Sequence, residues 1–266
     1  MALLLVGAGV IISILGSLLG IGGGVILVPF LVLGLHVPIH QAVATSLVAI
    51  IATSSQVAAF GEQHGFTNIR LALLLNAFTI LGATLGSLWA TRVEEEILRD
   101  IFAGAVFVIA FIMLIQNRLK QTPPPESNSG YFAAEYYDPN EKRDIAYRPG
   151  HVAAAFGAIF VSGAFSGMIG TSGGIFNVPV LSLVSRVPIR AAAATSSLMI
   201  GLTAVAGTLV YYQAHFIRPA LATPIVLGIM LGSWLGTRLS VHVHSKWLRR
   251  LFIVLLLVTA LKMIMA

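Results

Sequence analysis

The chain carries the sequence GIGGGVILVP at residues 20–29, and a related sequence, GTSGGIFNVP, at residues 170–179. Both copies interrupt long apolar runs with glycines. The same dipeptides follow each copy at the same spacing: Val37-Pro38 and Thr45-Ser46 after the first, Val187-Pro188 and Thr195-Ser196 after the second. A repeat of this length and register predicts an internal duplication of the chain.

The composition is that of a lipid-embedded protein. Of the 266 residues, 57% are hydrophobic and only 10% are charged, whereas soluble domains carry about 25% charge. Several apolar runs reach the roughly 20 residues that a bilayer-spanning helix needs. The chain is therefore predicted to be a polytopic membrane protein with the lipid bilayer as its partner. The absence of cysteine excludes disulfides, thiol catalysis and cysteine metal sites.

Apolar segments occur in two sets of four. They fall at roughly 2–34, 41–60, 69–91, 97–117, 151–185, 191–212, 217–238 and 247–265. This pattern predicts an all-α fold of about eight transmembrane helices in two homologous halves, each opening with a glycine-broken helix. The predicted regions are a first repeat at 1–117, a polar linker at 118–150 and a second repeat at 151–266. For the linker, a plain tether is favoured over a regulatory role for its tyrosines.

The first segment of each half is too long for one span. We expect a span at 2–20 followed by a half-helix at 25–34, and the same pattern at 151–169 and 175–185. Four crossings per half would make the repeats parallel, and five would make them inverted; the sequence leaves both open. The parallel case places these basic residues on one cytoplasmic side, with both termini and the linker outside: Arg92, Arg99, Arg186, Arg190, Arg238, Lys246, Arg249 and Arg250.

The glycine breaks are the predicted substrate site. Unwound backbone is tolerated in a membrane only where it is buried in protein or lines a wet cavity. The free N–H groups and positive dipole end of a following helix attract anions. The predicted backbone donors are Gly22, Gly23, Gly24, Ser172, Gly173 and Gly174. The predicted side-chain donors are Thr45, Ser46, Thr195, Ser196 and Asn177, with Asn76 and Gln56 as weaker candidates.

Plainer interpretations stand beside this one. Glycines also permit close packing of helices, which is the better explanation for Gly82, Gly86, Gly228, Gly232 and Gly236. Serine and threonine hydroxyls also bond a carbonyl one turn back. No Asp or Glu lies inside a predicted span, which argues against cation transport and favours an anionic substrate. No catalytic constellation or dinucleotide fingerprint is present, so we expect no enzyme activity, no cofactor, no metal and no nucleic-acid partner.

The residues quoted above resemble the TauE/SafE family of sulfite and organosulfonate exporters. The resemblance rests on Gly20–Gly24 with Val28-Pro29, on the second copy at Gly170–Gly174 with Val178-Pro179, and on the Val-Pro and Thr-Ser pairs. It implies a multi-pass inner-membrane transporter that moves small sulfur-containing anions such as sulfite, sulfoacetate or related sulfonates.

The first hypothesis is a secondary transporter that exports such anions by alternating access of its two halves. An anion channel of the same architecture and a non-transporting membrane scaffold are the alternatives. Transport direction, coupling ion and assembly into a homo-oligomer are left open. The copies differ at Gly22 against Ser172 and at Leu27 against Asn177, so the second copy is predicted to hold more of the specificity.

Overall fold

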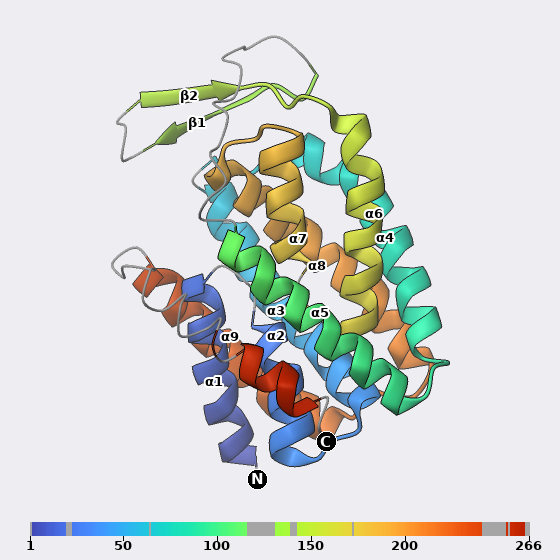
Figure 1. Ribbon diagram of the computed structural model, residues 1–266. Helices are drawn as coiled ribbons and strands as arrows, with labels where there is room; N and C mark the ends of the chain where they lie inside the picture. The colour runs from blue at the N-terminus through green and yellow to red at the C-terminus, as the bar shows by residue number, and fades with distance from the viewer. Residues whose placement is uncertain are drawn as a thin grey trace.

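The protein is described by a computed structural model that covers residues 2–19, 23–63, 65–115, 131–138, 143–171, 173–240, 254 and 256–263. It is a bundle of helices with a short β-hairpin at one end (Figure 1). The first half contains α1 (Ala2–Leu19), α2 (Gly24–Pro29), η1 (Phe30–Gly34), α3 (Ile39–Gln63), α4 (Ile69–Ala90) and α5 (Glu95–Ile115). The linker region contains β1 (Ala134–Asp138) and β2 (Arg143–Tyr147), and the later residues form α6 (Val152–Ile169), α7 (Gly174–Pro179), η2 (Val180–Val184), α8 (Ile189–Gln213) and α9 (Pro219–Ser240).

The all-α polytopic fold is confirmed. Within the described part of the chain, five helices are long and apolar enough to cross a bilayer: α3, α4, α6, α8 and α9. Many of their large apolar side chains face outward, as Leu73 and Leu81 of α4 do. Apolar side chains on the outer surface of the bundle are what contact with lipid requires.

Both predicted half-helices are present. The α2–η1 and α7–η2 segments each contain 11 residues, Gly24–Gly34 and Gly174–Val184, or about 16 Å of helix against roughly 30 Å of hydrocarbon. Each changes from α-helix to the wider π-helix directly after a proline, Pro29 or Pro179. Proline has no N–H to continue the α-helical ladder, which explains why the helical register changes at this point.

Glycines bring the first helix of each half against the third helix of the other. A Cβ atom on Gly82 of α4 would overlap the carbonyl oxygen of Phe160 in α6. In the same way, a Cβ atom on Gly228 of α9 would overlap the carbonyl oxygen of Val6 in α1. The packing interpretation of these glycines is therefore confirmed, and close backbone contact of this kind is a common source of helix association in membranes.

The matching helices α3 and α8 run in opposite directions. His40, at the start of α3, stacks on Phe216, just beyond the end of α8, with ring centroids 4.7 Å apart. At the other end, a Cβ atom on Gly61 of α3 would lie 2.9 Å from the Cβ of Ala194, near the start of α8. Of the two open alternatives, the antiparallel α3 and α8 favour the inverted arrangement.

The predicted grouping of basic residues is wrong. His40 Nε2 lies 3.0 Å from the carbonyl oxygen of Ala90 and 3.1 Å from that of Val93, which places Arg92 at the end of the bundle where α3 begins. Arg186 precedes α8, which begins at the opposite end. The reason is that each half-helix returns the chain to the end from which its half started. The described part of the linker, 131–138 and 143–150, accordingly lies at the end opposite the N-terminus, not beside it (Figure 1).

Part of the linker folds onto the bundle as a hairpin. Strands β1 and β2 pair antiparallel, and their tyrosines Tyr136 and Tyr147 are buried against the end of the bundle. Asn68, which caps α4, donates a hydrogen bond from Nδ2 to the carbonyl oxygen of Phe132 at 2.9 Å. Burial raises the pKa of Tyr147 to about 12, so its hydroxyl stays neutral at physiological pH. The hairpin covers the end of the bundle where α4 begins.

Candidate functional site

The two helix breaks touch at the centre of the bundle. Ser46 Oγ, on α3, donates a hydrogen bond of 2.6 Å to the carbonyl oxygen of Gly170, which ends α6. A Cβ atom on Gly24, the first residue of α2, would lie 2.9 Å from that same oxygen. Gly170 has φ +61, a left-handed conformation in which glycine is preferred at helix ends. The structure therefore brings Gly24 and Ser46 of the predicted set to the second break.

At the second break, Asn177 is buried and hydrogen-bonded. Ser162 Oγ, on α6, donates to Asn177 Oδ1 at 2.6 Å. The carbonyl oxygen of Gly173 accepts from the backbone amides of Phe176 and Asn177 at 3.0 and 2.8 Å, so the first turn of α7 is closed. Asn177 is only 2% exposed, so its side chain lies inside the bundle and not against lipid, and its predicted role as a substrate donor stays a prediction.

A small polar gap lies beside the second break, between α4, α6, α7 and α8. Its space, about 150 Å³ in all, is too narrow in this conformation to hold a water molecule. Its polar lining consists of Thr79, Ser162, Ser166, Asn177 and Thr203, together with the backbone of Gly173. A ligand can enter this space only if the surrounding helices separate.

Asn76 connects the walls of this gap. Its Oδ1 accepts hydrogen bonds from Thr79 Oγ1 at 2.8 Å and from Thr203 Oγ1 at 3.2 Å. These three groups join α4 to α8 in the buried interior. Buried hydroxyl and amide groups are costly unless they are paired, so such a cluster is informative about function. Sequence reasoning ranked Asn76 low.

The sequence did contain a signal for this cluster. Ser162 and Ser166 stand four residues apart in the last two turns of α6, which places them on one helix face directly before the break. Ser166 Oγ donates to the carbonyl oxygen of Thr171 at 2.7 Å. The sequence signal for the polar gap is therefore a pair of hydroxyl side chains on the helix face that leads into the unwound segment.

The predicted Thr-Ser pairs have different surroundings. Thr195 Oγ1 accepts a hydrogen bond of 3.0 Å from the backbone amide of Asn68, so it holds the loop that leads into α4. Thr45 Oγ1 and Ser196 Oγ are buried and have no hydrogen-bond partner within the ranges that the structure describes. Ser196 Oγ lies 3.7 Å from the position of a Cβ atom on Gly174. Ser196 thus stands at the start of α7, as Ser46 stands at the start of α2.

Four further predicted residues remain to be placed. Gly23 has φ +66, and its carbonyl oxygen accepts from the amides of Ile26 and Leu27, both at 3.1 Å. Gly22 and Ser172 lie outside the described residues. Gln56, the other weak candidate, is bonded to the carbonyl oxygen of Met230 at 3.1 Å, away from the gap.

The site is built entirely from neutral groups. The breaks and the gap present backbone amides, hydroxyls and two carboxamides, and the half-helices begin at them. The positive end of a helix dipole carries roughly half an elementary charge. Such an arrangement attracts an anion weakly, and its described residues include no carboxylate that would repel one.

A lipid-embedded helical bundle with two short broken helices and buried polar groups at the breaks defines a multi-pass membrane transporter. The chain belongs to the Sulfite exporter TauE/SafE family, whose model matches residues 5–263.

Several relatives carry the same general description. The chain is 25% identical to the "Probable membrane transporter protein YunE" of Bacillus subtilis, over 91% of this chain and 88% of the relative. It is 26% identical to a "Probable membrane transporter protein" of Xylella fastidiosa, over 97% and 93%. It is 25% identical to the "Probable membrane transporter protein MJ0441" of Methanocaldococcus jannaschii, over 92% and 89%. No solved structure matches the chain.

Proposed function

We propose that the protein exports small sulfur-containing oxyanions, such as sulfite, sulfoacetate or related sulfonates, across the inner membrane. The substrate binds at the paired breaks and in the polar gap beside the second. The observation that carries this proposal is the buried, uncharged cluster around Asn177 and Ser162, which opens onto the start of a half-helix. The family name supplies the sulfur-containing class of substrate.

The chemistry of the cluster suits an oxyanion. Hydroxyl and carboxamide groups donate hydrogen bonds to an anion without neutralising it, so the anion can be released again. A hydrogen bond to a charged group contributes roughly 1.5 to 3 kcal/mol. A few such bonds bind a small anion with moderate affinity, which is what a carrier that must also release its substrate needs.

The inverted arrangement supports alternating access as the mechanism. Matching helices have equal lengths: 18 residues in α1 and α6, 25 in α3 and α8, and 22 in α4 and α9. These equal lengths also support the internal duplication. Two halves of one design in opposite orientations can exchange conformations, which opens the site first to one side and then to the other. The closed gap favours such a carrier over a continuously open channel.

The test is transport by purified protein in liposomes loaded with labelled sulfoacetate. We expect counterflow with unlabelled sulfoacetate, and at least about a tenfold lower initial rate in Asn177→Leu, because one hydrogen bond to a charged ligand is lost. Gln56→Leu is the matched control, since it removes a carboxamide that lies outside the gap.

Each result has a definite meaning. Wild-type protein that transports no sulfonate or sulfite would overturn the proposed function. Equal transport by well-folded Asn177→Leu and by wild type would show that the substrate does not bind at the second break. A rate that does not respond to unlabelled substrate on the opposite side would indicate a channel.

A further inference from the structure

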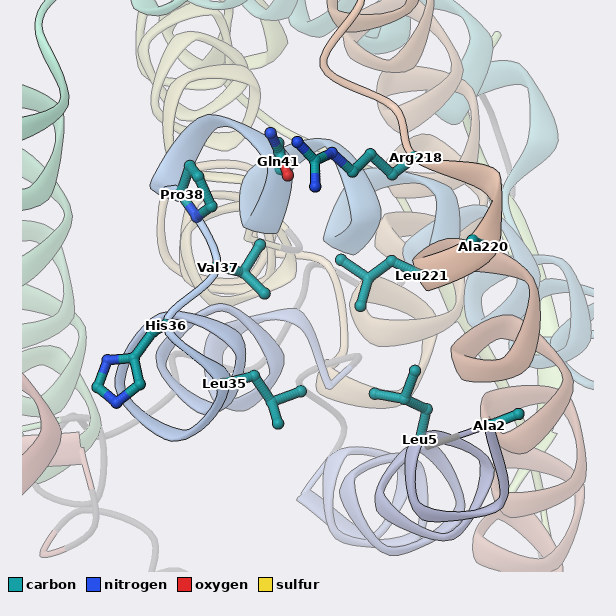
Figure 2. Close-up of a pocket in the computed structure, with 10 residues that line it drawn as sticks. All are labelled: Ala2, Leu5, Leu35, His36, Val37, Pro38, Gln41, Arg218, Ala220 and Leu221. Atoms are coloured by element: carbon teal, nitrogen blue, oxygen red, sulfur yellow. The ribbon is translucent and has the colours of Figure 1, made fainter.

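A second pocket, separate from the polar gap, opens at the end of the bundle that carries the N-terminus. It has a volume of about 550 Å³ and lies between the starts of α1, α3 and α9 and the segment after η1. Figure 2 shows Gln41 and Arg218 reaching into it from one side, with Val37, Leu221 and Leu35 below them. The pocket thus has a polar side with one cation and an apolar side.

Among the described residues, no acidic side chain neutralises the charge of Arg218. No Asp or Glu lines the pocket, and Arg218 forms no ion pair within the described part of the chain. Its carbonyl oxygen accepts from the amides of Leu221 and Ala222, both at 3.0 Å, which fixes its backbone at the start of α9. The side chain is exposed, so the guanidinium is available to a ligand.

The matching position in the first half is not occupied by an arginine. Asn68 stands at that position, before α4, and all of its groups serve the fold. Its Oδ1 accepts from the amide of Leu71 at 3.1 Å and its Nδ2 donates to the carbonyl oxygen of Phe132. The hairpin covers that end of the bundle, whereas Arg218 stands in an open pocket.

We propose that this pocket binds an organic oxyanion with a short aliphatic chain. The oxyanion lies on the Arg218 guanidinium, which can donate two parallel hydrogen bonds, with the Gln41 carboxamide beside it. The aliphatic chain lies on Leu35, Val37 and Leu221. That this pocket serves as a stopping point for the transported anion rests on the proposed function, but the binding itself does not.

Calorimetry on the full chain in phosphatidylcholine nanodiscs tests the pocket, with methane-, propane- and butanesulfonate as probes. Each added methylene is expected to tighten binding about fourfold while the chain still gains apolar contact. Arg218→Gln is expected to weaken butanesulfonate binding at least tenfold, and Arg218→Lys to retain part of the affinity. Arg92→Gln is the matched control, because Arg92 is an exposed arginine at the same end of the bundle but outside the pocket.

Equal binding by Arg218→Gln and wild type, or an equal loss in Arg92→Gln, would overturn the proposal. Nanodiscs that contain phosphatidylglycerol distinguish a lipid phosphate from a soluble anion. Displacement of butanesulfonate by that lipid in wild type but not in Arg218→Gln would assign the pocket to the lipid and overturn the soluble ligand. Asn177→Leu is expected to lose transport yet keep butanesulfonate binding. If wild type transports nothing while Arg218-dependent binding remains, only the proposed function fails.

Discussion

The two helix breaks stand at matching places in the fold, but two side chains beside them are apolar at the first break and polar at the second. Ser162 and Asn177 form a buried hydrogen bond at the second break, and the residues at the matching positions of the first are Ile12 and Leu27. Both of these are buried in the apolar core, at 5% and 1% exposure. A half-helix in this fold can therefore begin with apolar side chains at these two positions.

The adjacent helices repeat this contrast. In α4, Asn76 and Thr79 face the second break, and the residues at the corresponding positions of α9 are Val226 and Ile229, both apolar. We therefore expect substrate specificity to depend on the polar groups around the second break. The conformational change is expected to depend on both halves. Three comparisons between substitutions measure this difference.

The largest effect is expected at the glycine that joins the breaks. Gly170→Ala would place an alanine in a left-handed backbone conformation, with its Cβ 2.9 Å from the carbonyl oxygen of Val43. The expected loss of unfolding free energy is roughly 2 to 4 kcal/mol. Gly173→Ala is the control, because its nearest neighbour is Ser162 Oγ at 3.4 Å and its φ is −57. Its expected change is below about 1 kcal/mol. Thermal unfolding in nanodiscs measures both, and equal effects would contradict the close contact at Gly170.

A smaller effect is expected when the first break is given one polar group. Leu27→Asn places an unpaired carboxamide in an apolar core and should destabilise the fold by about 2 kcal/mol. Adding Ile12→Ser recreates the hydrogen-bonded pair of the second break and should recover part of that loss. A double-mutant cycle of unfolding free energies measures the coupling. No coupling between the two substitutions would show that the two breaks differ in more than these side chains.

The smallest effect separates the two serines. Ser46→Ala removes the hydrogen bond to the Gly170 carbonyl and should cost about 1 kcal/mol. Ser196→Ala removes a hydroxyl without a partner among the described residues, so its unfolding temperature should stay near that of wild type. A larger loss at Ser196 than at Ser46 would reverse this assignment.

Local features of the fold were predictable from the sequence, and relations between distant segments were not. The breaks at Gly24 and Gly174 and the packing role of Gly82 follow from glycine and proline positions along the chain. The direction of each half depends on whether an 11-residue helix returns the chain to its starting end. Composition cannot decide this, so Arg92 and Arg186 were assigned to the same side.

The polar gap could not be found from the sequence for a related reason. Thr79, Ser162 and Thr203 come from three different helices and meet only after the bundle is packed. In the sequence each resembles Thr84, whose hydroxyl bonds the carbonyl oxygen of Ile80 one turn back at 2.8 Å. Spacing identified Asn177 because it stands directly inside the repeated motif.

The hairpin in the linker bears on the relative stability of the two conformations that alternating access requires. Two inverted halves of identical sequence would make the inward-open and outward-open conformations equally stable. The tyrosines Tyr136 and Tyr147 are buried at only one end of the bundle, so their contacts count fully in the conformation that keeps that end closed. Every 1.4 kcal/mol of such one-sided contact changes the ratio of the two conformations about tenfold. Under the alternating access proposed above, the linker is therefore expected to bias the direction in which the empty protein faces.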